Sequence, residues 1–175
     1  AVKATNGVGL ESEISVSDGI RFDSSYQPQL KIIPSTPTDG VEFTGLAFLA
    51  PSAMTVVLRA YDAAGSMVVG RGIRNPATLS LTGGQQHARL LTELFGLQSF
   101  DGWIEAEASG AGLGVFTATG RWDMSTLDGS VARDTSSDFV LFHGGASAIL
   151  VNPSPRTASV TMTFLNISGS RSFSI

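Results

Sequence analysis

The chain has 175 residues, of which 42% are hydrophobic and only 15% are charged, so it can bury a real core as one large domain or two small ones. Its net charge is −4 and its 11 lysines and arginines are scattered, which excludes the clustered basic face that nucleic-acid binding needs. It has no cysteine, which excludes disulfides and thiolate sites, and no apolar run long enough for membrane insertion as a helix. Low charge and 20 glycines are typical of an all-β protein, and we predict an extracellular or cell-surface location.

The first forty residues predict a hairpin, a short strand and a linker. Apolar and polar residues alternate until the pair Asp18-Gly19 supplies a tight turn, so we expect a hairpin at 9–23. A further strand at 30–33 ends at a proline. Because the segment 34–40 contains two prolines, it cannot be helical and is interpreted as a linker.

The next part of the chain predicts short strands separated by turn residues. The strongly apolar run 41–50 is expected to form a buried strand that turns at Pro51 and pairs with a strand at 55–61. Two further strands are expected at 66–73 and 77–81.

One short helix is predicted near 90–95. Its four apolar residues share one helical face, and Gly96 follows where a C-terminal cap would lie. A helix of about one and a half turns is not stable alone, so we expect it to close the end of a sandwich.

The segment after the helix predicts a hairpin and a long loop. A strand at 101–108 alternates large polar or aromatic residues with small apolar ones. Its hairpin partner is expected at 114–119. The polar segment 120–138 is the longest predicted loop.

A repeat dominates the organisation of the chain. The pattern of residues 45–66 returns at 147–170, and the second copy stops before any counterpart of the helix. We therefore interpret 41–138 as one complete unit, flanked by an N-terminal hairpin and linker at 1–40 and a partial repeat at 139–175. Two arrangements are open: the partial ends complete each other within one molecule, or they pair between molecules.

Several stretches of the complete unit carry a resemblance. They are Phe43-Thr-Gly-Leu-Ala-Phe-Leu-Ala-Pro-Ser, Tyr61-Asp-Ala-Ala-Gly, Gly84-Gln-Gln-His-Ala-Arg-Leu-Leu-Thr-Glu-Leu-Phe and Phe100-Asp-Gly-Trp-Ile-Glu. These stretches resemble the immunoglobulin- or fibronectin-like repeat modules of secreted bacterial surface proteins. The resemblance implies an all-β antiparallel sandwich outside the cell, and it carries over no catalytic residue.

Few residues indicate catalysis. The chain has two histidines and no Gly-x-Ser-x-Gly motif, so a serine nucleophile is not indicated. Glu105 and Glu107 share one strand face about 7 Å apart, a spacing that inverting glycosidases use. Solvent-facing strands routinely carry such glutamates, and small neighbours offer no pocket to raise a pKa, so a glycoside hydrolase is the remote alternative.

Aromatic residues predict a ligand-binding site where their rings are exposed, and the alternative for Trp103 is a place in the core or over the other sheet. Rings of Trp122, Trp103 and Tyr61 can stack on sugar faces, and the carboxylates of Glu105 and Glu107 can accept hydroxyl hydrogen bonds. We therefore consider polysaccharide as a partner.

Acidic residues of the predicted loop at 120–138 are candidate metal ligands, and they are favoured over a zinc site built from the two histidines. Asp123, Asp128 and Asp134 are oxygen ligands of the kind that calcium prefers, but they lack EF-hand spacing. We predict no cofactor, with calcium as the alternative.

The partial second copy and the low charge favour a non-enzymatic extracellular β-sandwich module with a structural, adhesive or self-assembly role, as in a fibre. Its expected partners are copies of itself or neighbouring surface modules. The alternative is a carbohydrate-binding module that uses exposed aromatic residues.

Overall fold

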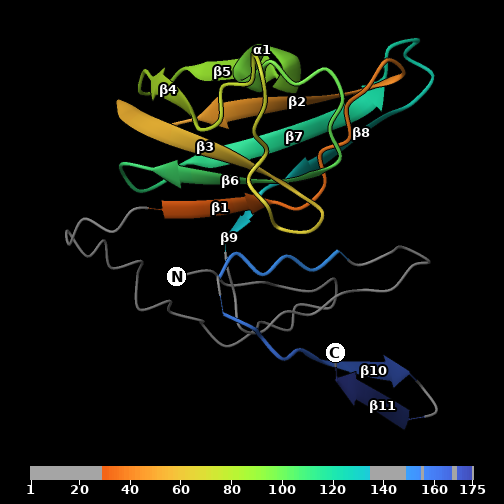
Figure 1. Ribbon diagram of the computed structural model, residues 1–175. Coiled ribbons are helices and arrows are strands. Elements are labelled where there is room, and N and C mark those ends of the chain that lie inside the picture. The colour runs from red at the N-terminus through yellow and green to blue at the C-terminus, as the bar shows by residue number, and fades with distance from the viewer. Residues whose placement is uncertain (1–28, 135–148, 155, 167–168, 175) are drawn as a thin grey trace, which may run out of the picture.

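The computed structural model describes residues 29–134, 149–154, 156–166 and 169–174 (Figure 1). In chain order the elements are β1 (Gln29–Ile33), β2 (Glu42–Leu49), β3 (Met54–Asp62), β4 (Ala77–Leu81), β5 (Gln86–Leu90), α1 (Leu91–Phe95), β6 (Gly102–Ala108), β7 (Gly114–Arg121), β8 (Leu127–Val131), β9 (Arg133–Asp134), β10 (Thr161–Asn166) and β11 (Gly169–Ser174). The hairpin expected at 9–23 lies outside the described residues.

Two antiparallel sheets pack face to face around one core (Figure 1). The strand order is β4-β3-β6-β1-β9 in the five-stranded sheet and β5-β2-β7-β8 in the four-stranded sheet. Alternate side chains point inward, so that Leu46 and Phe48 of β2 meet Val56 and Leu58 of β3 in one buried cluster. The predicted all-β sandwich is confirmed.

The short helix α1 packs beside β2 and β5 and adds three side chains to the core, those of Leu91, Leu94 and Phe95. Gly96 ends the helix in the left-handed conformation, with φ 76°, and its N–H donates to the Thr92 carbonyl at 2.9 Å. The predicted helix and its glycine cap are therefore confirmed.

Two predicted hairpins are wrong. β2 pairs with β5 and β7, whereas β3 pairs with β4 and β6, so the turn at Pro51 carries the chain from one sheet to the other. In the same way β7, at 114–121, pairs with β2 and β8 and not with β6. A short connection brings two strands close but does not decide whether they pair or face each other across the core.

The loop predicted at 120–138 is also wrong over its described part. β8 pairs with β7 as a hairpin, and the two-residue β9 pairs with β1. All residues of β8 are exposed, because this strand lies at the edge of its sheet. Its polar composition therefore reflects an edge strand and not a loop.

Two further differences concern the segment between β3 and α1. The strand expected at 66–73 is reduced to a single bridge between Met67 and Tyr61. The strand β5, which the sequence analysis did not predict, occupies Gln86–Leu90 at the other edge of the four-stranded sheet. The predicted strand at 77–81 coincides with β4.

The segment 34–40 crosses between the sheets and is packed into the fold. Thr36 and Thr38 are buried, and the Thr36 N–H and hydroxyl both donate to the Gly102 carbonyl at 3.1 Å. The preceding strand β1 lies between β6 and β9. Within the described residues the sandwich therefore includes β1 and the segment 34–40 in addition to strands of the predicted unit 41–138.

The second copy of the repeat contains a hairpin of β10 and β11. Within the described part of the chain this hairpin pairs with no other strand, whereas β3, the counterpart of β10, has a neighbour on each side. Residues 149–151, the counterpart of the second half of β2, form no strand. The two copies therefore share a sequence pattern but differ in their described structure.

The strand order does not confirm an immunoglobulin type. Among the described strands, β1 and β2 lie in opposite sheets, and so do β2 and β3. The immunoglobulin or fibronectin type stays a prediction.

Candidate functional site

Two of the predicted aromatic residues meet on the outer surface of the five-stranded sheet. Tyr61 of β3 and Trp103 of β6 are direct cross-strand partners, and their rings stack with centroids 4.3 Å apart and an angle of 15°. Burial raises the pKa of the Tyr61 hydroxyl above its ordinary value, and the nearby Glu105 carboxylate raises it further. The pair is a half-buried aromatic platform.

The third predicted aromatic residue lies on the other sheet. Trp122 follows β7, and its ring lies 5.0 Å from that of Phe43 on β2. Its indole N–H donates to the Asp39 carbonyl at 3.3 Å, and the side chain is 49% exposed. The structure therefore does not bring Trp122 together with Tyr61 and Trp103 in one site.

The paired glutamates are bridged by a cation. The Arg59 guanidinium Nη1 donates to Glu105 and to Glu107, each at 2.8 Å. These bonds, that to Glu107 first, raise the pKa of Arg59 above its ordinary value. An acid and a base for glycoside hydrolysis need different environments, whereas these carboxylates share one partner. The arrangement favours a structural ion-pair network.

A cavity of about 350 Å³ lies next to the aromatic platform, on the side of Trp103. Its polar lining includes Ser35, Asp101 and Asn152, and the chain segment 149–151 supplies apolar side chains. An aromatic wall beside hydroxyl, carboxylate and amide groups is a chemistry that suits a sugar ring. Neither Glu105 nor Glu107 lines this cavity.

The three aspartates considered for calcium have separate partners. Asp123 accepts from the Ser125 hydroxyl at 2.6 Å, and its pKa is lowered by its hydrogen bonds to Ser125. Asp128 accepts from the N–H of the residue that follows it, and Asp134 pairs with Lys31 at 2.9 Å. Among the described residues no three His, Asp or Glu side chains gather to hold a metal ion. The structure therefore does not assemble the calcium site considered from the sequence.

The outer surface of the four-stranded sheet is almost wholly apolar. We call this surface the apolar face, and its members, placed by the strand register, are Gln86, Ala88 and Leu90 of β5, Phe43, Gly45, Ala47 and Leu49 of β2, Gly114, Phe116, Ala118 and Gly120 of β7, and Leu127, Gly129 and Val131 of β8. Gln86 is the only polar member, and none is charged. By contrast, the outer surface of the five-stranded sheet carries Arg59, Glu105 and Glu107.

Several large members of the apolar face are open to solvent. The exposed fractions are 53% for Leu49, 46% for Phe116, 62% for Leu127 and 57% for Val131. An antiparallel sheet that packs one face on a core usually presents polar residues on the other. Contiguous exposed apolar side chains of this kind are typical of interaction surfaces and ligand-binding grooves.

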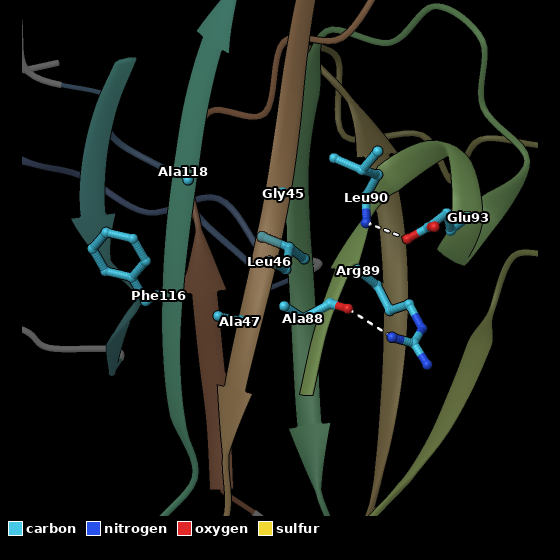
Figure 2. A pocket seen from close by; sticks show the side chains of 9 residues that line it. All are labelled: Gly45, Leu46, Ala47, Ala88, Arg89, Leu90, Glu93, Phe116 and Ala118. Carbon is cyan, nitrogen blue, oxygen red and sulfur yellow. Dashed lines mark hydrogen bonds between the residues drawn. The ribbon is translucent and has the colours of Figure 1, made fainter. Parts of the chain in front are cut away.

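A shallow groove of about 240 Å³ runs along this face (Figure 2). Its floor is made by small residues of three adjacent strands, Gly45, Ala47, Ala88 and Ala118. Figure 2 shows the Phe116 ring on one side of them and Leu90 and Arg89 on the other. At that second border, Leu90 N–H donates to Glu93 at 2.9 Å, and Arg89 donates to the Ala88 carbonyl at 2.8 Å.

This surface was not predicted, because the strongly apolar run 41–50 indicated a buried strand. Thr44, Leu46 and Phe48 are indeed buried, but Leu49 on the opposite face is exposed. The signal that could have found the groove is the alternation of small residues, as at Gly45 and Ala47, with large apolar ones.

No family model matches the chain, and neither the curated proteins nor the solved structures contain a significant match to it. In the described residues no helix is long and apolar enough to cross a membrane. The function must therefore be argued from the two outer surfaces of the sandwich.

Proposed function

We propose that the chain is a non-enzymatic extracellular β-sandwich module with a structural, adhesive or self-assembly role, and that it binds a macromolecular partner through the apolar face. The observation that carries this proposal is the contiguous set of exposed apolar side chains on a sheet surface without charge. From strand spacing and rise, the four strands present about 400 Å². Patches of that size on soluble proteins are commonly functional. The low charge of the chain supports the extracellular location.

The proposal is tested by placing charge on the apolar face. The double variant Leu49→Lys with Val131→Lys adds two cations at exposed positions of this face. The matched control, Thr78→Lys with Ser80→Lys, adds the same charge at exposed positions of β4, on the outer surface of the other sheet. Circular dichroism and thermal unfolding establish that both variants are folded.

Retention on an octyl-agarose column and sedimentation velocity are the two measurements. We expect the parent chain and the control to show column retention, self-association or both. The double variant of the apolar face is expected to lose whichever of these properties the parent shows. If the double variant behaved as the parent does in both measurements, the apolar face would not be a binding surface.

The cavity beside Trp103 favours a second candidate function, the binding of polysaccharide. A sugar ring would stack on the indole while Asp101 and Asn152 accept or donate hydrogen bonds to its hydroxyls. Pull-down with insoluble polysaccharides, together with a glycan array, tests this function. We expect Trp103→Ala to abolish retention and Trp122→Ala, on the other sheet, to preserve it. No retention of the parent chain would reject this candidate.

A further inference from the structure

We propose that the partner of the apolar face is a second copy of this chain, docked face to face around a two-fold axis that runs parallel to the strands between β2 and β7. This inference rests on the proposed function, because it names the partner of the same surface. It is carried by the distribution of large and small side chains in the strand register.

One row across the face separates small from large residues. The printed register joins Ala88 to Ala47, Ala47 to Phe116, and Phe116 to Val131, from β5 through β2 and β7 to β8. The β5 and β2 half of this row is therefore hollow, and the β7 and β8 half is raised. In the next row along β2 the order is reversed, because Leu49 is opposite Gly114.

A two-fold axis between β2 and β7 exchanges the two halves. It places β7 of one copy over β2 of the other, and β8 over β5. Phe116 then enters the groove over Ala47 of the second copy, Val131 lies over Ala88, and Leu49 lies over Gly114. Large residues meet small ones reciprocally, as two interdigitating sheets require.

The raised side of the face is fixed before docking. The Phe116 ring lies against Gly129 of β8, so closely that a Cβ atom at this glycine would collide with the ring. A side chain held in this way loses little rotamer freedom when a partner covers it. The named members of the apolar face carry no charge, and the two charged side chains that line the groove, Arg89 and Glu93, lie at its border, where each is hydrogen-bonded to the backbone of β5.

The area of the face sets the strength of the dimer. About 400 Å² from each copy gives about 800 Å² in total, below the roughly 1,200 Å² at which standard stable interfaces begin. The net charge of −4 on each copy opposes association as well. We therefore infer a weak dimer that forms with increasing protein concentration, and not an obligate one.

Sedimentation velocity of the full chain over a range from micromolar to millimolar concentration tests the dimer. We expect the parent chain to pass from monomer to dimer. Phe116→Asp is expected to weaken dimerisation at least about tenfold, because it removes the large apolar side chain that enters the groove and buries a carboxylate over its small apolar floor. Ala47→Asp should have the same effect from the groove side, and Thr78→Asp, on the other sheet, should have none.

The absence of cysteine from the chain permits a geometric test with single-cysteine variants. Under the proposed axis, position 131 of one copy lies opposite position 88 of the other at about the 10 Å sheet spacing, whereas like positions lie about 17 Å apart. A short bis-maleimide should therefore link a mixture of Ala88→Cys and Val131→Cys faster than either variant alone. Faster linking of like positions would overturn the proposed axis.

The outcomes separate this inference from the proposed function. A chain that stays monomeric at millimolar concentration, but is retained on octyl-agarose through the apolar face, would overturn the dimer and leave the binding surface in place. A chain that neither dimerises nor binds through this face would overturn both. The result for Phe116→Asp is interpreted only if the far-ultraviolet circular dichroism spectrum of the variant matches that of the parent chain. If this variant does not fold, Ala47→Asp provides the second test of the dimer.

Discussion

Arg59 and Glu105 lie directly opposite each other on β3 and β6, and Arg59 Nη1 donates to the Glu105 carboxylate at 2.8 Å. The same nitrogen donates to Glu107 at 2.8 Å, so one cation serves two carboxylates on one strand face. This network gives the five-stranded sheet a charged outer surface. The outer surface of the four-stranded sheet has no charged member, and it is the surface that we propose as the binding face.

Removal of the shared cation is expected to weaken the sandwich modestly. In Arg59→Met, Glu105, whose side chain is 15% exposed, loses its partner, while Glu107, 40% exposed, stays solvated. Because solvent screens this partly exposed network, we expect a loss of about 1 kcal/mol in the free energy of unfolding, measured by urea titration. Glu105→Gln should cost more than Glu107→Gln. Equal stability of Arg59→Met and the parent would show that the network contributes nothing.

The turn before β2 is expected to make stability depend on pH. The Asp39 carboxylate accepts from Glu42 N–H at 2.7 Å and Val41 N–H at 2.6 Å, and these bonds lower its pKa from 3.8. Because the pKa of Asp39 is lower in the folded chain than in the unfolded chain, the carboxylate stabilises the fold at every pH above the pKa of the unfolded chain. This stabilisation is lost as the pH falls through the pKa of the folded chain. In Asp39→Asn the urea midpoint should therefore lie below that of the parent at pH 6, and the difference should shrink below about pH 4. A difference of the same size at pH 2 would contradict this assignment.

Much of the fold is predictable from local pattern. The alternation at 101–108 gives the strand and its faces, and the apolar periodicity with Gly96 gives the helix and its cap, because these signals depend on neighbours in sequence. Pairing is different. The turn at Pro51 looks the same whether it joins strands of one sheet or arches over the core, so the partners of β2 and β3 could not be derived.

The candidate site was less predictable than the fold. Cross-strand geometry brings Tyr61 and Trp103 together, as one shared face would suggest, but Trp122 belongs to the other sheet. The groove depends on the register of β5, β2 and β7, which aligns Ala47 with Ala88 and Phe116. The register of paired strands is set by contacts between residues that are far apart in the sequence, so local sequence patterns do not predict it.

The helix cap offers a test of backbone strain. A Cβ atom at Gly96 would lie 2.6 Å from the Gly72 carbonyl oxygen, and the residue has φ 76°. Gly96→Ala should therefore lower the free energy of unfolding by more than the roughly 1–2 kcal/mol that the left-handed conformation alone costs. Gly65→Ala is the matched control, because φ is 82° there but no atom lies within 4 Å of the added carbon. If urea titrations showed the same loss in the free energy of unfolding for both variants, the backbone at Gly72 would move away from the added Cβ atom without a measurable cost.

A buried hydroxyl of β7 predicts a stabilising substitution. Thr117 is 3% exposed, and its Oγ1 has no hydrogen-bond partner within the part of the chain that the structure describes. A buried hydroxyl without a partner keeps its desolvation cost, so Thr117→Val should raise the free energy of unfolding by about 1 kcal/mol. Thr36→Val is the control: its hydroxyl donates to the Gly102 carbonyl at 3.1 Å, and its replacement should lower stability by about the same amount. Thermal and urea unfolding measure both variants. If Thr117→Val lost as much stability as Thr36→Val is expected to lose, the Thr117 hydroxyl would have a hydrogen-bond partner in the folded chain and the prediction would be wrong.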